Sequence, residues 1–299
     1  MSTPTLVVLG GTGFVGSHLV PTLHRAGYRL ILLSRNRARH RDLGVLPNVR
    51  IENADVYDAG VLARWLDGAD AAINLVGILN ERGTDGRGFR RAHVELTAGL
   101  LDACRVAGVR RLLQMSALRA GEGRSHYLAT RGEAEALVKA SGLDWTLCRP
   151  SVIFGRGDGL YFRFARLLRF VPVLPLARAE ARFAPVYVGD VAEAMVRSLA
   201  DRASIGRTYE LGGPRIQTLA GIVRETVRWC GMKRLIVPLP DPLARVQAAI
   251  FDHVPGKPFS SDNYRSLLLD SIPSHDGLAA LGIRATSAEN VMPGMLGRR

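Results

Sequence analysis

The stretch Gly10-Gly11-Thr12-Gly13-Phe14-Val15-Gly16 decides the fold of this 299-residue chain. It follows an apolar run, Thr5–Leu9, that predicts a strand, and it opens a segment, Phe14–Ala26, that predicts a helix. The first glycines of such a motif let the chain turn tightly beside a pyrophosphate, and the last one lets helix and strand pack closely. Free N–H groups at the helix start attract phosphate. We therefore expect a dinucleotide to contact Gly10, Thr12, Gly13, Phe14, Val15 and Gly16.

The rest of the first half alternates short apolar runs with helical patterns. The runs do not alternate polar with apolar residues, which is typical of parallel strands buried on both faces. Strands linked by helices form right-handed βαβ units, so the sequence predicts an α/β fold with a doubly wound parallel sheet (Rossmann). Further strands are expected at Arg29–Ser34, Val49–Glu52, Ala71–Asn74, Arg111–Ser116 and Asp144–Arg149, and helices at Ala59–Leu66, His93–Ala107 and Ser125–Ala140.

After Pro150 the pattern changes to a smaller region that would shape a substrate pocket. We predict a dinucleotide-binding domain over residues 1–155, joined by 182–212, and a lid or substrate domain over 156–181 and 213–299. Asp190 is interpreted as a helix N-cap. The expected strands are Ala184–Val188, Thr208–Leu211 and Leu235–Val237, and the expected helices are Tyr161–Phe170, Asp190–Ala200, Leu219–Cys230 and Leu243–Val254.

Composition excludes several classes of protein. Hydrophobic residues make up 47% and charged residues 22%, as in globular proteins, and no apolar run is long enough for a spanning helix. Three cysteines, far apart, argue against disulfides and structural zinc, and the histidine spacing indicates no metal site. No signal-peptide pattern is present. We expect a cytoplasmic protein, at most peripheral to the inner face of the membrane.

The net charge is +13, and 37 of the 40 basic residues are arginine. The positive electrostatic potential of such a charge favours anionic partners, namely nucleotide phosphates or an anionic membrane surface. An arginine-biased composition spread over a solvated surface is the alternative. We do not expect the protein to bind nucleic acid, because the basic residues are not interspersed with aromatic ones and no helix-turn-helix or RRM pattern is present.

The end of the second expected strand indicates which dinucleotide binds. An acidic residue there binds the ribose hydroxyl of NAD, whereas this chain has Ser34-Arg35 and no acid before Asp42. A guanidinium can pair with the additional phosphate of NADP and stack on adenine. We therefore expect NADP(H) in preference to NAD(H), held by Ser34 and Arg35. Arg39 and Arg41 fit a solvated basic loop better.

Other candidate cofactor contacts follow later strands. Asp55, with Val56 beside it, could meet the adenine amino group or serve as a helix N-cap, and both interpretations stay open. The ends of the fourth and sixth strands would border the cofactor and flank the nicotinamide through Asn74, Val76, Gly77, Pro150 and Val152.

Together with Ser116 and Tyr127, the stretches Arg149–Gly155 and Pro185–Ala192 resemble the extended short-chain dehydrogenases/reductases. Within this family the chain is most similar to the atypical branch that holds the NADPH-binding accessory subunit of respiratory complex I and its bacterial relatives. The resemblance covers residues 5–215 well. It implies a Rossmann fold, a bound dinucleotide and a partner in a membrane complex.

Active members of the family use Ser, Tyr and Lys, the last two in Tyr-x-x-x-Lys spacing. The resemblance assigns these catalytic positions to Ser116, Tyr127 and Arg131. Tyrosine exchanges a proton with the substrate oxygen, and a nearby cation lowers its pKa. Arginine keeps the charge but cannot reproduce the placement of a compact ammonium. We favour a cofactor-bound protein with little or no catalysis, an accessory or assembly subunit; an active NADP-dependent reductase, dehydrogenase or epimerase is the alternative.

Two apolar stripes suggest further contacts. Phe164, Leu167, Leu168 and Val171 follow a helical spacing, and Leu243, Val246, Ile250 and Val254 form a second stripe. The first stripe, with arginines beside it, fits either a lid over the pocket or a contact with anionic lipid or an acidic partner. An apolar small-molecule substrate would suit both stripes.

Overall fold

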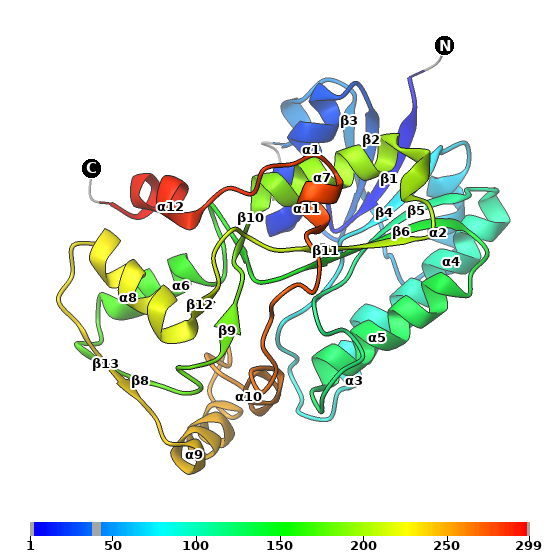
Figure 1. Ribbon diagram of the computed structural model, residues 1–299. Coiled ribbons are helices and arrows are strands. Elements are labelled where there is room, and N and C mark those ends of the chain that lie inside the picture. Colours follow the sequence, from blue (N-terminus) through cyan, green and yellow to red (C-terminus); the bar gives the residue numbers. More distant parts are fainter. Residues whose placement is uncertain (1–2, 38–42, 298–299) are drawn as a thin grey trace.

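The computed structural model describes residues 3–37 and 43–297, and a seven-stranded sheet is its centre (Figure 1). The strand order is β11-β6-β5-β4-β1-β2-β3, and every pairing is parallel. This confirms the doubly wound Rossmann fold. Because β1 lies between β2 and β4, its carboxyl end marks the point where strand order reverses and ligands bind. The strands are β1 (Thr5–Leu9), β2 (Arg29–Ser34), β3 (Val49–Asn53), β4 (Ala71–Asn74), β5 (Arg111–Met115), β6 (Asp144–Pro150) and β11 (Arg207–Leu211).

Helices cover both faces of this sheet, which explains its unbroken apolar strands. From β1, Leu6 and Val8 pack in one cluster and Val7 and Leu9 in the other. Each face therefore needs its own helical layer. One layer consists of α1 (Phe14–Arg25) and α7 (Val188–Ala200); the other consists of α2 (Ala59–Leu66), α4 (Leu96–Ala107) and α5 (His126–Lys139).

The helix expected from His93 begins earlier. It runs from α3 (Arg87–Arg90) through a π-helical segment, η3 (Arg91–Glu95), into α4. π-helical insertions are rare and are frequent at functional sites. This one turns His93 toward α5.

The C-terminal half builds a second core. Tyr161 and Leu168 of α6 (Tyr161–Leu168) pack with Leu174, Ile222 and Met292. The surrounding elements are β8 (Val173–Leu176), α8 (Leu219–Trp229), β13 (Leu235–Pro238), α9 (Asp241–Phe251), α10 (Ser261–Ser266) and α12 (Ala288–Leu296). In Figure 1 most of them lie at lower left, below the large sheet, whereas α12 lies at the left, at the height of the sheet.

Short elements link the two halves. The strand expected at Ala184–Val188 is only β10 (Val186–Tyr187), and it pairs with β7 (Ile153–Phe154) in a separate two-stranded sheet instead of joining the main one. The expected last strand, in contrast, is β11 of the main sheet. The remaining short elements are β9 (Arg182–Phe183), β12 (Gln217–Thr218), η2 (Leu43–Val45) and η4 (Arg202–Ser204).

The chain returns to the large sheet near its C-terminus. Helix α11 (Gly277–Ala280) carries Leu278 into the same core as α1 and α7, and Leu281 and Ile283 follow it. Asp190 holds this return: its carboxylate accepts the Thr286 N–H at 2.6 Å and the Thr286 hydroxyl at 2.9 Å. Asp190 is therefore not an N-cap, since α7 already begins at Val188. The two-domain division remains a proposal, with residues 277–285 packed on the dinucleotide-binding part.

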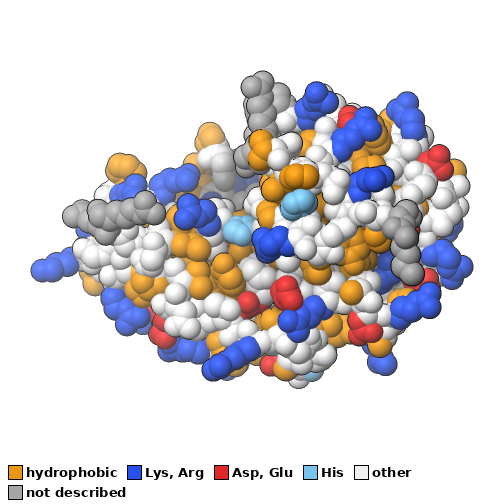
Figure 2. All heavy atoms as spheres, turned by 90° about the horizontal axis from the view of Figure 1, so that it is seen from above, with side chains coloured by type: hydrophobic (Ala, Val, Ile, Leu, Met, Phe, Trp, Pro, Cys, Tyr) orange, Lys and Arg blue, Asp and Glu red, His pale blue; other side chains and the backbone are white. Residues whose placement is uncertain are grey.

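The positive charge is spread over the surface. Figure 2 shows Lys and Arg side chains scattered across the face seen from above, with fewer acidic ones between them. Over residues 3–37 and 43–297, no helix combines the length and apolarity needed to cross a membrane. No group of three or more His, Cys, Asp or Glu in those ranges could hold a metal ion.

Leu278→Ala tests whether the returning segment belongs to the core. Leu278 is fully buried, so its truncation should lower the free energy of unfolding by about 2–4 kcal/mol. The control is Leu268→Ala, since Leu268 is half-exposed and should cost little. Urea unfolding followed by circular dichroism measures both. Equal, small losses in the two variants would show that residues 277–285 do not stabilise the fold.

Candidate functional site

The glycine-rich loop is shaped for a close main-chain approach. Gly10 has a left-handed φ of +75°, and a Cβ there would lie 3.0 Å from the Val76 nitrogen. A Cβ on Gly16 would lie 2.3 Å from the Gly11 carbonyl oxygen. Gly13 is exposed and caps α1 without a side-chain hydrogen bond. The first N–H groups of α1 are thus left for an anionic ligand, as a bound dinucleotide requires.

The predicted site residues gather at one edge of the sheet. Carboxyl ends of parallel strands share an edge, and the structure brings all the predicted strand-end positions there. Ser34 ends β2; Asp55 and Val56 follow β3; Asn74, Val76 and Gly77 end or follow β4; Ser116 follows β5; Pro150 ends β6 and Val152 follows it.

A group of cationic and aromatic side chains lies beyond β2 and β3. The Arg91 guanidinium carbon lies 4.5 Å from the centre of the Tyr57 ring. Burial raises the pKa of Tyr57, and the charges of Arg91 and Arg35 oppose this rise. Arg35 is exposed beside them, whereas Arg39 and Arg41 lie outside the described residues. The sequence alone did not predict that Tyr57 and Arg91 lie near the cofactor site. Their positions depend on how a loop and a helix are placed in three dimensions.

Two polar residues at this edge are engaged within the protein. Asp55 accepts the Tyr57 N–H at 3.0 Å, and the N-cap of α2 is Asp58, so the N-cap interpretation of Asp55 was wrong. Asn74 donates to Gln114 at 3.0 Å and accepts the Val76 N–H at 3.0 Å. Asn74 thus fixes the chain that carries Val76 and Gly77 to the site. Asp55 is exposed and remains a candidate for the adenine contact.

Tyr127 and Arg131 lie one turn apart on α5. The Arg131 guanidinium carbon is 5.6 Å from the centre of the Tyr127 ring. Phe89 and His93 pack against the same ring, with centroids 6.1 and 5.6 Å away. The tyrosine is half-buried, held between two aromatic rings and one cation.

Arg131 is buried beneath the site. One of its terminal nitrogens donates to the Met115 carbonyl at 3.0 Å and to the Val76 carbonyl at 3.5 Å. Gly77 makes room for the guanidinium, since a Cβ there would lie 1.8 Å from Nη2. The buried Nε has no hydrogen-bond partner within the described residues. Such a donor fits a cofactor hydroxyl, although its position differs from that of a lysine ammonium.

Ser116 is bound to a buried carboxylate that the sequence analysis missed. Its hydroxyl donates to Glu135 at 2.6 Å, and Glu135 is almost fully buried. Arg149 donates to both oxygens of that carboxylate, at 2.8 and 2.5 Å. This hydrogen bond raises the pKa of Arg149. Glu135 stands four residues after Arg131, so helical spacing could have placed it near the site.

His93 is a neutral residue beneath Tyr127. Its Nε2 accepts the Ile78 N–H at 3.3 Å, which leaves Nδ1 as the donor to the Thr130 hydroxyl at 2.9 Å. Burial, and then the charge of Arg131, lower the pKa of His93 to about 2. The imidazole is therefore uncharged at neutral pH.

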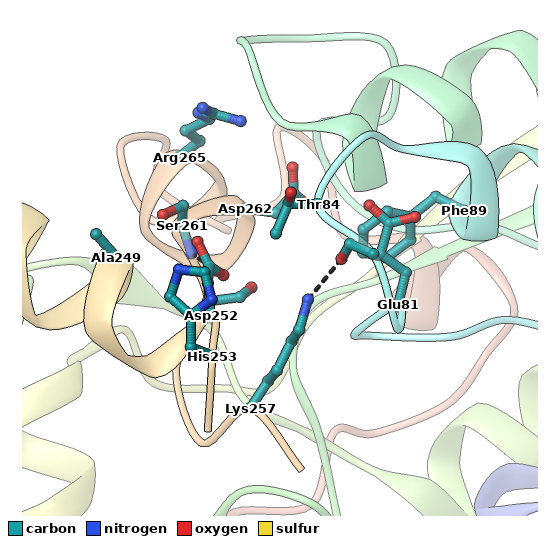
Figure 3. Close-up of a pocket in the computed structure, with 12 residues that line it drawn as sticks. Glu81, Thr84, Phe89, Ala249, Asp252, His253, Lys257, Ser261, Asp262 and Arg265 are labelled. Atoms are coloured by element: carbon teal, nitrogen blue, oxygen red, sulfur yellow. Dashed lines mark hydrogen bonds between the residues drawn. The ribbon is translucent and has the colours of Figure 1, made fainter. Parts of the chain in front are cut away.

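A cavity of about 280 Å³ opens beside the start of α5 (Figure 3). Glu81 and Phe89 line one side, and Asp252, His253 and Lys257 line the other. Asp262 joins this cavity to Tyr127, since its carboxylate accepts the N–H groups of His126 at 2.6 Å and Tyr127 at 3.1 Å. Residues of both halves line this cavity, and most of the lining side chains are polar or charged.

Comparisons with known proteins agree with this geometry. A family model described as NAD(P)H-binding matches residues 10–202. The chain is 32% identical over 292 residues to NADH dehydrogenase (ubiquinone) 1 alpha subcomplex subunit 9, mitochondrial, of Arabidopsis thaliana, covering 91% of this chain and 71% of that protein. It is 29% identical to a ceramide reductase of Caulobacter vibrioides, covering 83% and 77% of the two chains.

Solved structures show the same fold. The dTDP-glucose 4,6-dehydratase of Streptomyces venezuelae, crystallised with NAD, superposes with a TM-score of 0.78 at 23% identity and covers 97% of this chain and 95% of that one. The fold and the glycine-rich loop therefore define a dinucleotide-binding protein of the short-chain dehydrogenase/reductase type. The chain belongs to the NAD(P)H-binding family that the match over residues 10–202 identifies.

The low pKa of His93 predicts how stability depends on pH. Below the ordinary pKa of 6.5 the unfolded chain takes up a proton that the folded protein does not, so stability falls as pH falls. From pH 7 to pH 5 this one group should remove ~2 kcal/mol of unfolding free energy. Urea titrations of the wild type and His93→Gln at both pH values measure it.

The His93→Gln variant should lose this part of the pH dependence, whatever its stability at pH 7. His253→Gln is the control for a histidine-to-glutamine exchange at an exposed position. An identical pH slope in wild type and His93→Gln would mean that the imidazole is protonated in the folded protein.

Proposed function

We propose that this protein binds NADP(H) as a tightly held cofactor and serves as an accessory or assembly subunit of a membrane-associated respiratory complex, with little or no turnover. The observation that carries the proposal is the Ser116–Glu135 hydrogen bond of 2.6 Å. The serine proton points to a buried carboxylate instead of a substrate carbonyl. The plant mitochondrial relative, named as a subunit of NADH dehydrogenase, supports a partner of that kind.

The position of Arg131 supports the same conclusion. A nicotinamide supplies or accepts hydride when bound, and the protein must then move a proton at the substrate oxygen. Tyr127 is the residue that would hold this proton. The neighbouring cation is anchored to the Met115 and Val76 carbonyls, so it cannot shift toward the substrate as a flexible lysine could.

The basic residues beyond β2 support NADP(H) in preference to NAD(H). Arg35 is exposed at the end of β2, and its charge acts on Tyr57 together with that of Arg91. Two guanidinium groups and an aromatic ring suit a ribose phosphate beside an adenine.

An active NADP-dependent reductase is the second candidate. The contact of 5.6 Å between Arg131 and the Tyr127 ring keeps a cation beside the proton donor. The ceramide reductase of Caulobacter vibrioides, 29% identical, supports this candidate. The substrate would then carry a carbonyl or hydroxyl group.

Arg35→Ala tests the cofactor preference. Loss of a charge-assisted hydrogen bond of about 1.5–3 kcal/mol should weaken NADPH binding roughly 10- to 100-fold and leave NADH binding nearly unchanged. Calorimetric titration with both dinucleotides measures this. Arg37→Ala is the matched control, because Arg37 is also exposed and, among the residues that the structure describes, only its main-chain N–H is hydrogen-bonded, to Asn53. Equal weakening by both variants would refute a specific phosphate contact at Arg35.

Tyr127→Phe separates the two candidate functions. We expect the purified protein to retain stoichiometric NADPH, seen by mass and absorbance, and to consume none with a panel of carbonyl substrates, in wild type and variant alike. Turnover in the wild type that falls at least 100-fold in Tyr127→Phe would instead establish the reductase. Arg131→Lys is the companion variant: NADPH consumption appearing only there would assign the missing activity to the guanidinium.

A further inference from the structure

Exposed apolar side chains concentrate on one part of the C-terminal half. Sixteen large hydrophobic residues of the described chain are exposed, and ten of them fall between residues 167 and 254. Globular proteins expose single apolar residues everywhere, but a contiguous group marks an interaction surface. Apart from Ile216, which lies outside the elements discussed below, they are Leu167, Phe170, Val173, Leu235, Val237, Leu243, Val246, Ile250 and Val254.

These residues come from neighbouring elements. Strands β8 and β13 pair in register, with Leu235 opposite Val173, and paired residues point to the same side. Gln247 of α9 donates to the Pro175 carbonyl of β8 at 3.2 Å, so α9 lies directly beside this small sheet. In Figure 1, β8, β13 and α9 form the lower end of the molecule.

The apolar stripe of α9 points away from the core. Ala244 and Ala248 are the buried residues of this helix, whereas Leu243, Val246 and Ile250 are exposed by 54, 55 and 58%. The apolar stripe of this helix therefore does not cover the pocket. The α6 stripe divides: Leu168 is buried in the second core, while Leu167 and, at the helix end, Phe170 are exposed. We call these exposed residues, with β8 and β13, the apolar face.

Unpaired cations border the apolar face. Arg166 and Arg169 of the α6 end and Lys233 before β13 are exposed, and none has a carboxylate within 4.0 Å in the described ranges. The nearby acid Asp241 is already paired with Arg178 and Arg245. The border is thus positively charged, in a chain of net charge +13.

We propose that the apolar face docks on an anionic lipid surface, with its aliphatic side chains in the interfacial region and Arg166, Arg169 and Lys233 on the headgroups. Aliphatic residues bordered by cations suit anionic headgroups above acyl chains. A second copy of this chain suits the face less well, because a symmetric pair would bring the same cations close together. The inference does not depend on cofactor chemistry.

Flotation with lipid vesicles tests this. The wild-type protein should bind vesicles of phosphatidylglycerol and phosphatidylcholine in equal parts at low salt, and bind pure phosphatidylcholine weakly. Val246→Glu with Ile250→Glu should weaken binding about tenfold or more. Replacing Arg166, Arg169 and Lys233 by Gln should remove the preference for anionic vesicles and the salt dependence.

Val106→Glu is the matched control, since Val106 is equally apolar and 79% exposed on α4, away from this face. Dinucleotide binding by each variant verifies folding. Failure of the wild type to float with anionic vesicles at low salt overturns the proposal. So does undiminished flotation of the glutamate double variant. A wild-type dimer in light scattering that this variant converts to monomer, without vesicle binding, assigns the face to a second copy instead.

Discussion

The close approach of helix α1 to the ends of β1 and β4 is the constraint on which the rest of the structure depends. Gly16 lies so near the Gly11 carbonyl that no Cβ fits there, and a Cβ on Gly10 would make a tight contact with the Val76 nitrogen. This contact aims the free N–H groups of α1 at the point where strand order reverses. It also sets the course of residues 75–77, against which Arg131 is placed. The same contact therefore positions both the anion-binding N–H groups of α1 and the chain beside Arg131.

The surroundings of Tyr127 show how an arginine at position 131 affects its neighbours. A guanidinium at position 131 needs more room than an ammonium, and Gly77 provides it. Its charge, together with burial, keeps His93 neutral, and neutral His93 in turn bonds Ile78 and Thr130. On the other side Glu135 accepts hydrogen bonds from the Ser116 hydroxyl and the Arg149 guanidinium. Apart from the Arg131 Nε, these buried polar groups bond one another, and such a network holds one arrangement firmly, which supports the proposed retention of a cofactor.

The two halves of the molecule are coupled at defined points. Asp262 of α10 binds the main chain of Tyr127, and Asp190 of α7 binds Thr286. Both are carboxylates accepting N–H groups from segments roughly a hundred residues or more away in sequence. Movement of the C-terminal half would therefore reach Tyr127 directly, and α9, which carries part of the apolar face, is hydrogen-bonded to α10 through Arg245 and Tyr264.

The sequence by itself determined the Rossmann sheet, its order of elements and the strand-end positions of the dinucleotide site. Buried parallel strands carry continuous apolar runs, and a glycine-rich turn has a local signature, so neighbouring residues suffice to predict both. Only the tertiary structure decided the partners of Ser116, the role of Asp190 and the return of Leu278 to the first core. These depend on contacts between distant segments, as with Asp262 and α5, which are 135 or more positions apart. Helical periodicity correctly located the stripe on α9, but it cannot tell which side of a helix meets the core. That side depends on the neighbouring elements, and here Ala244 and Ala248 occupy it.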